Sequence, residues 1–411
     1  MSTAAEPRGG LAVVVSYPHL VSGVVAILLF VVLVIGDLIL ERARLQSRIA
    51  QLAPLQFTEK WKGEAAPRAL LTRSDVLPLY GSSELIYDMP NRATDFFSAY
   101  PTGFTVAPLG DRGYPALTMA VGIASLGRAL EGRKIVVSLS GTWFLGDDTE
   151  HDATTLKAHF SPLQAGDVIF YRRLPSDLTE RMAREIMSHD PVPRDFPMLH
   201  AALACLARRC GYERLIPVFA PLWAMRTLLL RTEDYRRVAQ AVDHRAPPRQ
   251  RSERVDWGAL EGRGDSLWRL ESASNVLGIQ DTIWNRHKEQ MPAGDAGSRD
   301  TAFLALMEKA PKWTDLDILL ATLKAVGARP LILNSPLKGV YWEYRGVTAA
   351  ARQRYYRHFD SVAVRYGFPT VYFQERDQDP YFLSESRSHL SSKGWAVYDR
   401  IINAFQHDSL R

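Results

Sequence analysis

The chain has 411 residues, of which 46% are hydrophobic and 23% charged, so it has room for one large domain or two ordinary ones. This composition is typical of a folded protein and excludes disorder over the whole chain. The formal net charge of +5 favours anionic partners. Because the chain has no zinc-finger spacing, RNA-binding aromatic motif or basic low-complexity tail, we expect no nucleic acid among them. An anionic lipid or a phosphate-rich envelope polymer would suit the charge as well.

An apolar segment from Leu20 to Leu40 is long enough to cross a bilayer core, about 30 Å at 1.5 Å per residue. A charged continuation, ERARLQSR, follows it in place of the cleavage site of a signal peptide. We therefore expect residues 1–17 to precede an uncleaved transmembrane anchor over 18–40. Residues 41–66 are predicted to form a basic juxtamembrane stalk helix that ends in the interface-like patch Lys60-Trp61-Lys62. Arginines are more frequent just after the span than before it, and taken alone this places the bulk of the chain in the cytoplasm.

The body, residues 67–411, alternates between two hydrophobic patterns. Apolar runs that end in turn residues predict strands at Val76–Tyr80, Lys134–Ser140, Pro330–Asn334 and Thr370–Phe373. Helical periodicity follows at Leu117–Leu130, Trp313–Ala325, Thr348–Tyr366 and Gly394–Phe405. Strands that alternate with helices of this length predict a parallel α/β sheet. Residues from about 145 to 300 are predicted to be a helical insertion, in which 243–266 is a polar surface loop with a chance RGD triplet.

The two cysteines, Cys205 and Cys210, lie five residues apart in a segment with a helical pattern. On a continuous helix they would face different sides, so a bridge between them would be strained. With no CxxC pair and no histidine cluster nearby, we expect two small core residues and no metal site.

Two segments carry groups suited to nucleophilic chemistry. Ser83 lies in Tyr80-Gly81-Ser82-Ser83-Glu84-Leu85, directly after the first predicted strand of the body. A serine at such a turn can present its hydroxyl at the sheet edge, although an isolated GSSE is more often only a turn and helix cap. His389 precedes the last predicted helix and could act as a general base, although a histidine at a helix start is usually a surface group.

The order of several motifs resembles the D-alanyl transfer family DltD, which belongs to the broader group of SGNH hydrolases and acyltransferases. The resemblance runs from about residue 67 to the C-terminus, with an apolar N-terminal segment where the family has its anchor. It rests on Gly81–Leu85, Gly110–Leu117, Ser140-Gly141-Thr142-Trp143-Phe144, Phe160-Ser161-Pro162-Leu163-Gln164, Trp313–Leu319, Ser335-Pro336-Leu337, Tyr344-Arg345-Gly346-Val347 and Tyr381–Trp395. It implies an SGNH-hydrolase-like (flavodoxin-like), doubly wound parallel sheet with helical insertions after one transmembrane helix.

The resemblance also implies roles for single residues. Ser83 matches the nucleophile, with Ser82 as the weaker alternative, and His389 matches the base. The oxyanion-hole glycine is Gly113, or alternatively Gly110. Side chains of the third block would line the site, namely Ser140, Thr142 and Trp143.

The acidic member of the site departs from the family pattern. The family usually has Asp three residues before the histidine, where this chain has Ser386. Glu385 stands one position further back and can orient the imidazole. Asp379, Asp377 or no third member at all are the alternatives.

The resemblance implies an extracytoplasmic serine O-acyltransferase that passes D-alanyl groups to a cell-envelope polymer, either teichoic acid or lipopolysaccharide or another surface glycan. It implies a membrane-bound O-acyltransferase (DltB-like) as the acyl donor, an anionic envelope polymer as the acceptor, and no metal or cofactor. It places the catalytic domain outside the cytoplasmic membrane, against the arginine count. A thioesterase or esterase with the same serine, and a non-catalytic scaffold of an acylation complex, are the alternatives.

Overall fold

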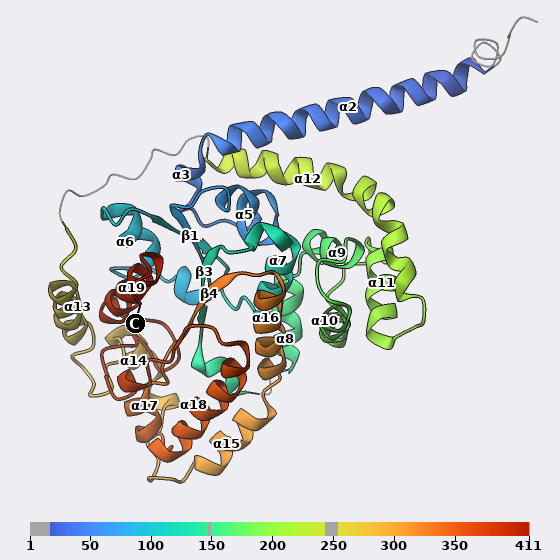
Figure 1. Cartoon of the computed structure of the whole chain (residues 1–411). Helices are drawn as coiled ribbons and strands as arrows, with labels where there is room; N and C mark the ends of the chain where they lie inside the picture. The colour runs from blue at the N-terminus through green and yellow to red at the C-terminus, as the bar shows by residue number, and fades with distance from the viewer. Residues whose placement is uncertain (1–16, 147–148, 243–253, 411) are drawn as a thin grey trace, which may run out of the picture.

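The computed structural model describes residues 17–146, 149–242 and 254–410. The first described helix, α2 (Pro18–Gln46), projects from the body of the molecule (Figure 1). Among the described residues it is the one helix long and apolar enough to cross a membrane, and little of its apolar stretch is buried. This is consistent with the membrane anchor expected over residues 18–40.

The body is built on a five-stranded sheet in which every pair of neighbouring strands is parallel, in the order β2-β1-β3-β4-β5. The strands are β1 (Val76–Tyr80), β2 (Thr105–Leu109), β3 (Lys134–Leu139), β4 (Arg329–Asn334) and β5 (Thr370–Val371). This is the flavodoxin-like order of a doubly wound sheet. Strand β1 is buried along its whole length, which explains its continuous apolar sequence.

Helices cover both faces of the sheet, and each face has its own hydrophobic core. The core on one face includes α7 (Ala116–Leu126), α16 (Lys312–Ala325) and α18 (Ala349–Ala363). The core on the other face includes α6 (Ala93–Ala99), α19 (Ser392–Gln406) and α13 (Trp257–Glu271). The expected parallel α/β architecture is therefore confirmed.

The long connection between β3 and β4 is helical, as predicted for residues 145–300. It contains α8 (Thr149–His159), α9 (Pro162–Phe170), α10 (Ser176–His189), α11 (Pro197–Arg208), α12 (Ala220–Val242), α13, α14 (Asp281–His287), α15 (Asp300–Lys309) and α16. Its 3-10 segments include η3 (Gly141–Phe144), η4 (Glu213–Phe219) and η5 (Lys288–Gln290). The shorter connections contain η1 (Ser83–Leu85), η2 (Gly127–Leu130), α17 (Gly339–Tyr344), η6 (Val364–Tyr366) and η7 (Gln374–Arg376).

Strand β2 was missed by the sequence patterns. Its sequence, TVAPL, is short and contains Pro108, which cannot donate a hydrogen bond within a sheet. The structure places β2 at the edge of the sheet, where an unused donor is tolerated.

The stalk helix predicted over residues 41–66 is wrong. Helix α2 continues to Gln46, and the chain then forms three short helices, α3 (Ile49–Leu52), α4 (Glu59–Lys62) and α5 (Ala65–Leu70). From Leu45 onward their apolar side chains belong to the core of the body. The Lys60 ammonium is fully buried and donates to the carbonyls of Ala53 and Leu55, both at 2.6 Å, so this patch is a packed corner and not a membrane interface.

The surface loop predicted over 243–266 is also wrong in the part that the structure describes; residues 243–253 lie outside that part. Helix α13 begins at Trp257, where the Asp256 carboxylate accepts from the Ala259 amide. The RGD triplet lies within this helix. A Cβ on Gly264 would come within 2.8 Å of the Lys393 backbone, and Asp265 binds the Lys393 ammonium at 2.6 Å. The triplet therefore joins α13 to the start of α19.

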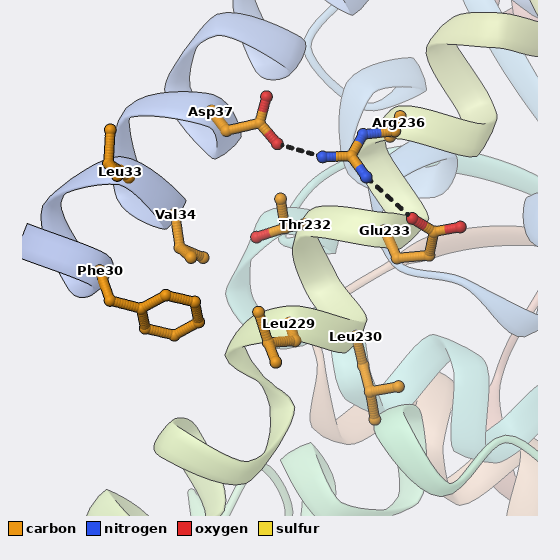
Figure 2. Close-up of a pocket in the computed structure, with 9 residues that line it drawn as sticks. All are labelled: Phe30, Leu33, Val34, Asp37, Leu229, Leu230, Thr232, Glu233 and Arg236. Carbon is orange, nitrogen blue, oxygen red and sulfur yellow. Dashed lines mark hydrogen bonds and ion pairs between the residues drawn. The ribbon is translucent and has the colours of Figure 1, made fainter. Parts of the chain in front are cut away.

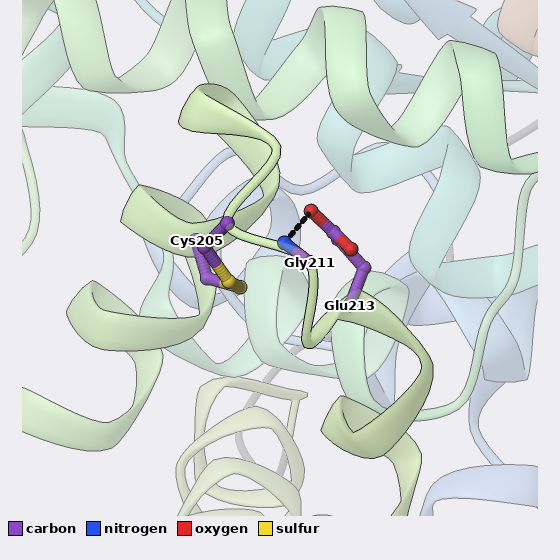
Figure 3. The surroundings of a disulfide bond; sticks show 4 residues. Cys205, Gly211 and Glu213 are labelled. Atoms are coloured by element: carbon purple, nitrogen blue, oxygen red, sulfur yellow. Dashed lines mark hydrogen bonds between the residues drawn. A yellow bond between two sulfur atoms is a disulfide. The ribbon is translucent and has the colours of Figure 1, made fainter.

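The cysteines form a disulfide bond (Figure 3). The expectation of two unlinked core residues is wrong because the helix does not continue between them. Helix α11 ends at Arg208, Arg209 adopts φ 54°, and the chain turns back so that the two Cα atoms are 4.9 Å apart. Within the described residues, Cys205, Cys210 and Glu213 are the one group of three side chains at metal-ligand distances, and the bridge leaves no thiolate there.

We expect the full chain, purified without reductant and then denatured, to show no free thiol. Replacing both cysteines with serine removes the bridge that limits the conformational freedom of the unfolded chain. Because the closed loop is short, the free energy of unfolding should fall by about 2 kcal/mol. Thiol titration and denaturant unfolding measure the two effects. Two free thiols per chain in protein from an oxidising compartment would contradict the bridge.

Candidate active site

The carboxyl ends of the parallel strands meet at one edge of the sheet, and Ser83 lies there, just after β1 at the start of η1. Its neighbour Ser82 is only 1% exposed, and the Ser82 hydroxyl donates to the Asp111 carbonyl at 3.3 Å. Ser83 is partly exposed. Of the two serines, Ser83 is therefore the one whose hydroxyl is available for chemistry.

The partner of Ser83 comes from the other end of the chain. The loop before α19 is closed by an antiparallel bridge between Leu383 and Leu390, and the Ser384 amide donates to the His389 carbonyl at 2.8 Å. This tight loop presents the imidazole to the sheet edge, where His389 Nε2 lies 2.8 Å from Ser83 Oγ. The two residues are 306 positions apart in the sequence.

A carboxylate lies on the far side of the imidazole. Glu385 Oε1 is 3.1 Å from His389 Nδ1, and both side chains are 17% exposed. The contact is an ion-pair contact without the alignment of a hydrogen bond. The Glu385 carboxylate is thus placed against the second ring nitrogen of His389.

The two alternative acids are engaged elsewhere. The Asp377 carboxylate accepts from the Arg352 guanidinium and from the Tyr356 hydroxyl. The Asp379 carboxylate lies 2.8 Å from the Lys393 ammonium and accepts from the Tyr381 amide. Of the three acids, Glu385 is the one placed against His389.

Three residues that the sequence analysis did not single out support this arrangement. The Tyr87 ring stacks on the His389 imidazole, with centroids 4.8 Å apart. The buried Glu84 carboxylate accepts from the Ser82 amide at 3.0 Å, and its burial raises the pKa of this group. The fully buried Lys338 ammonium donates to three carbonyls, those of Gly278, Pro380 and Leu383.

Each of these three contributes differently. Tyr87 limits the rotation of the imidazole. Glu84 closes the turn that carries Ser83, because its carboxylate accepts from the Ser82 amide. Lys338 holds the start of the loop that carries His389. Burial lowers the pKa of Lys338 to about 7. Glu84 belongs to the GSSE turn and Lys338 directly follows the Ser335-Pro336-Leu337 motif, whereas the role of Tyr87 depends on a contact across the fold.

The two candidate glycines lie in the loop after β2, which runs beside the serine turn. Gly110 has φ 152°, and a Cβ there would come 1.9 Å from the Gly81 carbonyl oxygen, so only glycine fits this close approach. Gly113 has φ 70°, and a Cβ there would come 3.0 Å from the Thr155 side chain. The structure therefore explains Gly110 by packing, and the assignment of an oxyanion amide to Gly113 stays a prediction.

The third block follows β3, the neighbour of β1, and so shares the same sheet edge. The hydroxyls of Ser140 and Thr142 lie 2.9 Å apart. Trp143 is half-buried against the core on the α7 face. These three residues lie after the neighbouring strand, and the structure records no bond from them to the serine–histidine pair.

A serine hydroxyl on an imidazole, with an acid at the other ring nitrogen, is an arrangement that can activate the serine as a nucleophile, and here an α/β fold carries it. The chain belongs to the DltD family, because the family model described as DltD protein matches residues 56–407.

Two relatives align with this chain over most of its length and most of their own. The chain is 24% identical over 363 residues to Protein DltD of Bacillus subtilis (strain 168), covering 87% of this chain and 89% of that protein. It is also 24% identical over 351 residues to Protein DltD of Staphylococcus aureus (strain NCTC 8325 / PS 47), covering 83% of each.

Replacing Glu385 with glutamine should slow serine labelling by a fluorophosphonate about 10- to 10³-fold, because the neutral amide no longer stabilises the imidazolium. The effect should be smaller than that of removing His389, since water reaches a partly exposed carboxylate. Intact-mass kinetics measure the rate, with Glu375→Gln, an exposed acid on η7, as the control. A rate within twofold of the parent would mean that the imidazole needs no acid at this position.

Proposed function

We propose that this protein is a membrane-anchored serine O-acyltransferase with an SGNH-like fold that transfers D-alanyl groups through an acyl-enzyme on Ser83. The observation that carries the proposal is the 2.8 Å contact between Ser83 Oγ and His389 Nε2 at the carboxyl edge of the sheet. Family membership and the flavodoxin-like strand order support it.

In the first step, His389 Nε2 takes the proton of Ser83 as its oxygen attacks the acyl carbonyl. Nε2 must then be unprotonated at the start, so Nδ1 carries the ring proton and faces Glu385. The amides of Ser83 and Gly113 would hold the oxyanion. The protonated imidazole returns its proton to the leaving group, and the acyl group remains on serine.

In the second step, a hydroxyl of the acceptor loses its proton to the same imidazole and attacks the serine ester. The product is an ester of the acceptor, and serine regains its proton. An alanyl ester adds an ammonium group and lowers the net negative charge of the acceptor. The net charge of +5 suits an anionic envelope polymer, teichoic acid or a lipopolysaccharide-type glycan.

The donor proposed from the family resemblance is a DltB-like membrane-bound O-acyltransferase, which would hand the acyl group to Ser83 at the membrane. The apolar helix α2 supports a place beside such a protein.

The disulfide supports an extracytoplasmic catalytic domain. Disulfides persist in oxidising compartments and are reduced in the cytosol. The Cys205–Cys210 bridge therefore favours the same side of the membrane as the family resemblance, against the count of arginines after α2.

The test measures alanine released by mild base from the envelope of cells that lack their own DltD protein. Cells supplied with the full chain should recover alanine esters, and cells supplied with Ser83→Ala should not. Ser361→Ala, an exposed serine on α18, is the matched control and should restore the esters fully.

The outcomes separate the alternatives. Restored esters with Ser83→Ala would favour a non-catalytic scaffold and overturn the acyl-enzyme. Loss of alanine esters when the parent chain is added to cells that keep their own DltD protein would favour an esterase.

A further inference from the structure

Exposed apolar side chains gather on one segment outside α2. Among the described residues outside that helix, fifteen large hydrophobic side chains are exposed, and eight of them lie on η4 and the first half of α12, or directly before them. They are Tyr212, Leu215, Val218, Phe219, Leu222, Met225, Leu229 and Leu230. Most follow each other at three or four residues and so share one face of the helix. The opposite face is anchored in the body by Ile216 and Trp223, both buried.

Helix α12 lies beside α2 near its C-terminal end, and its first part turns away from α2 toward α11 (Figure 1). Leu229 and Leu230 line a cavity of about 520 Å³ together with Phe30, Leu33 and Val34 of α2 (Figure 2). Seven residues further along each helix, Arg236 binds the Asp37 carboxylate at 2.6 Å. The two helices therefore run parallel, and the ion pair closes one end of the cavity.

Both helices change from apolar to charged at the same level. The apolar run of α2 is interrupted by Asp37 and ends at Leu40, directly before Glu41 and Arg42. The apolar face of α12 ends after Leu230, where Glu233 and Arg236 follow at helical spacing. A bilayer that takes up the apolar part of α2 must have its polar boundary near this ion pair, because charged groups avoid the hydrocarbon. The same bilayer would cover the apolar face of α12.

We propose that η4 and the first half of α12 embed in the lipid leaflet beside α2, so that the domain is seated on the membrane by two elements. The proposal rests on α2 as a membrane anchor, as in the proposed function. Arg208 and Arg214 are exposed beside the face, and the exposed Arg226 lies within it, one residue after Met225; the long side chains of these arginines can extend to lipid phosphates. Lipid acyl chains fill the cavity between the two helices.

Insertion of η4 and the first half of α12 restricts how the domain can rotate relative to α2 and the bilayer. With α2 alone, the body could rotate around the helix axis. A second inserted surface, joined to the body through Trp223 and to α2 through the Asp37–Arg236 pair, fixes one orientation of the Ser83 edge relative to the membrane.

The test uses the full chain reconstituted alone in vesicles of phosphatidylcholine and phosphatidylglycerol that contain a nitroxide-labelled acyl chain. A bimane fluorophore is attached to one introduced cysteine, and the native pair does not react because it is bridged. Bimane on Met225→Cys should lose as large a fraction of its fluorescence as bimane on Leu33→Cys of α2. Bimane on Val276→Cys, an exposed position in the loop after α13, should keep its fluorescence.

The same measurement distinguishes the possible failures. Quenching at Leu33 without quenching at Met225 would overturn the lipid seat and leave the anchor intact. Absence of quenching at Leu33 would remove the anchor, and with it this part of the proposed function. Protection of the Met225→Cys thiol from a charged maleimide in native membranes, without quenching in vesicles, would assign the face to a protein partner and overturn the lipid occupant.

Discussion

Ser83→Ala is expected to abolish the adduct that a fluorophosphonate forms with the full chain in detergent. The probe reacts with a serine whose proton is taken by a base, and the one hydroxyl that the structure places against His389 Nε2, within the described residues, is that of Ser83. His389→Ala should keep the hydroxyl and lower the labelling rate at least about 10³-fold, because the general base is lost. Intact-mass analysis over time measures both variants.

The neighbouring serine provides the matched control. Ser82→Ala removes a buried hydroxyl that donates to the Asp111 carbonyl, and it should leave a single adduct on Ser83. An adduct that persists in Ser83→Ala and disappears in Ser82→Ala would mean that Ser82 is the nucleophile. The absence of any adduct on a folded parent would mean that the isolated chain does not activate its serine.

Arg231→Met is expected to destabilise the body by about 3–5 kcal/mol, since it leaves two buried carboxylates without their main partner. The guanidinium of Arg231, on α12, lies 2.9 Å from the Glu64 carboxylate and also binds Asp167 of α9. Both acids are almost fully buried, and the Trp223 indole donates to Asp167 at 3.1 Å. Denaturant unfolding at pH 9, above the pKa of Glu64, measures the loss.

The loss should depend on pH. Burial raises the pKa of Glu64 to about 8, so between about pH 4.5 and 8 the folded chain binds more protons than the unfolded chain. In this window stability falls as pH rises, and removal of Arg231 strengthens the effect. The deficit of Arg231→Met should therefore be smaller at pH 5 than at pH 8.

Two further variants check this explanation. Adding Glu64→Gln to Arg231→Met should restore part of the stability, because one buried charge is removed. Arg365→Met removes an exposed guanidinium from Asp317, which keeps its contacts with Arg181 and Tyr366, and should cost no more than about 1 kcal/mol. Equal losses for Arg231→Met and Arg365→Met would mean that the buried cluster contributes no more than a surface pair.

The local sequence was sufficient to predict the anchor helix and most strands of the central sheet. The apolar run of α2 and the buried strands β1, β3 and β4 are visible in the sequence because each element must match its solvent or its two covered faces. The order of short motifs also indicated the family and pointed to Ser83 and His389, since nucleophile and base must come from residue types that titrate or react near neutral pH.

Tertiary contacts decided the rest. The availability of Ser83 over Ser82, and of Glu385 over Asp377 and Asp379, depends on which side chains other elements have already engaged. The disulfide required the left-handed turn at Arg209, which no helical periodicity reveals. The short helices after Gln46 are held by packing against the body, and isolated helices of that length are not stable in water. Long-range packing thus decides the elements whose own sequence is too short or too polar to determine their structure.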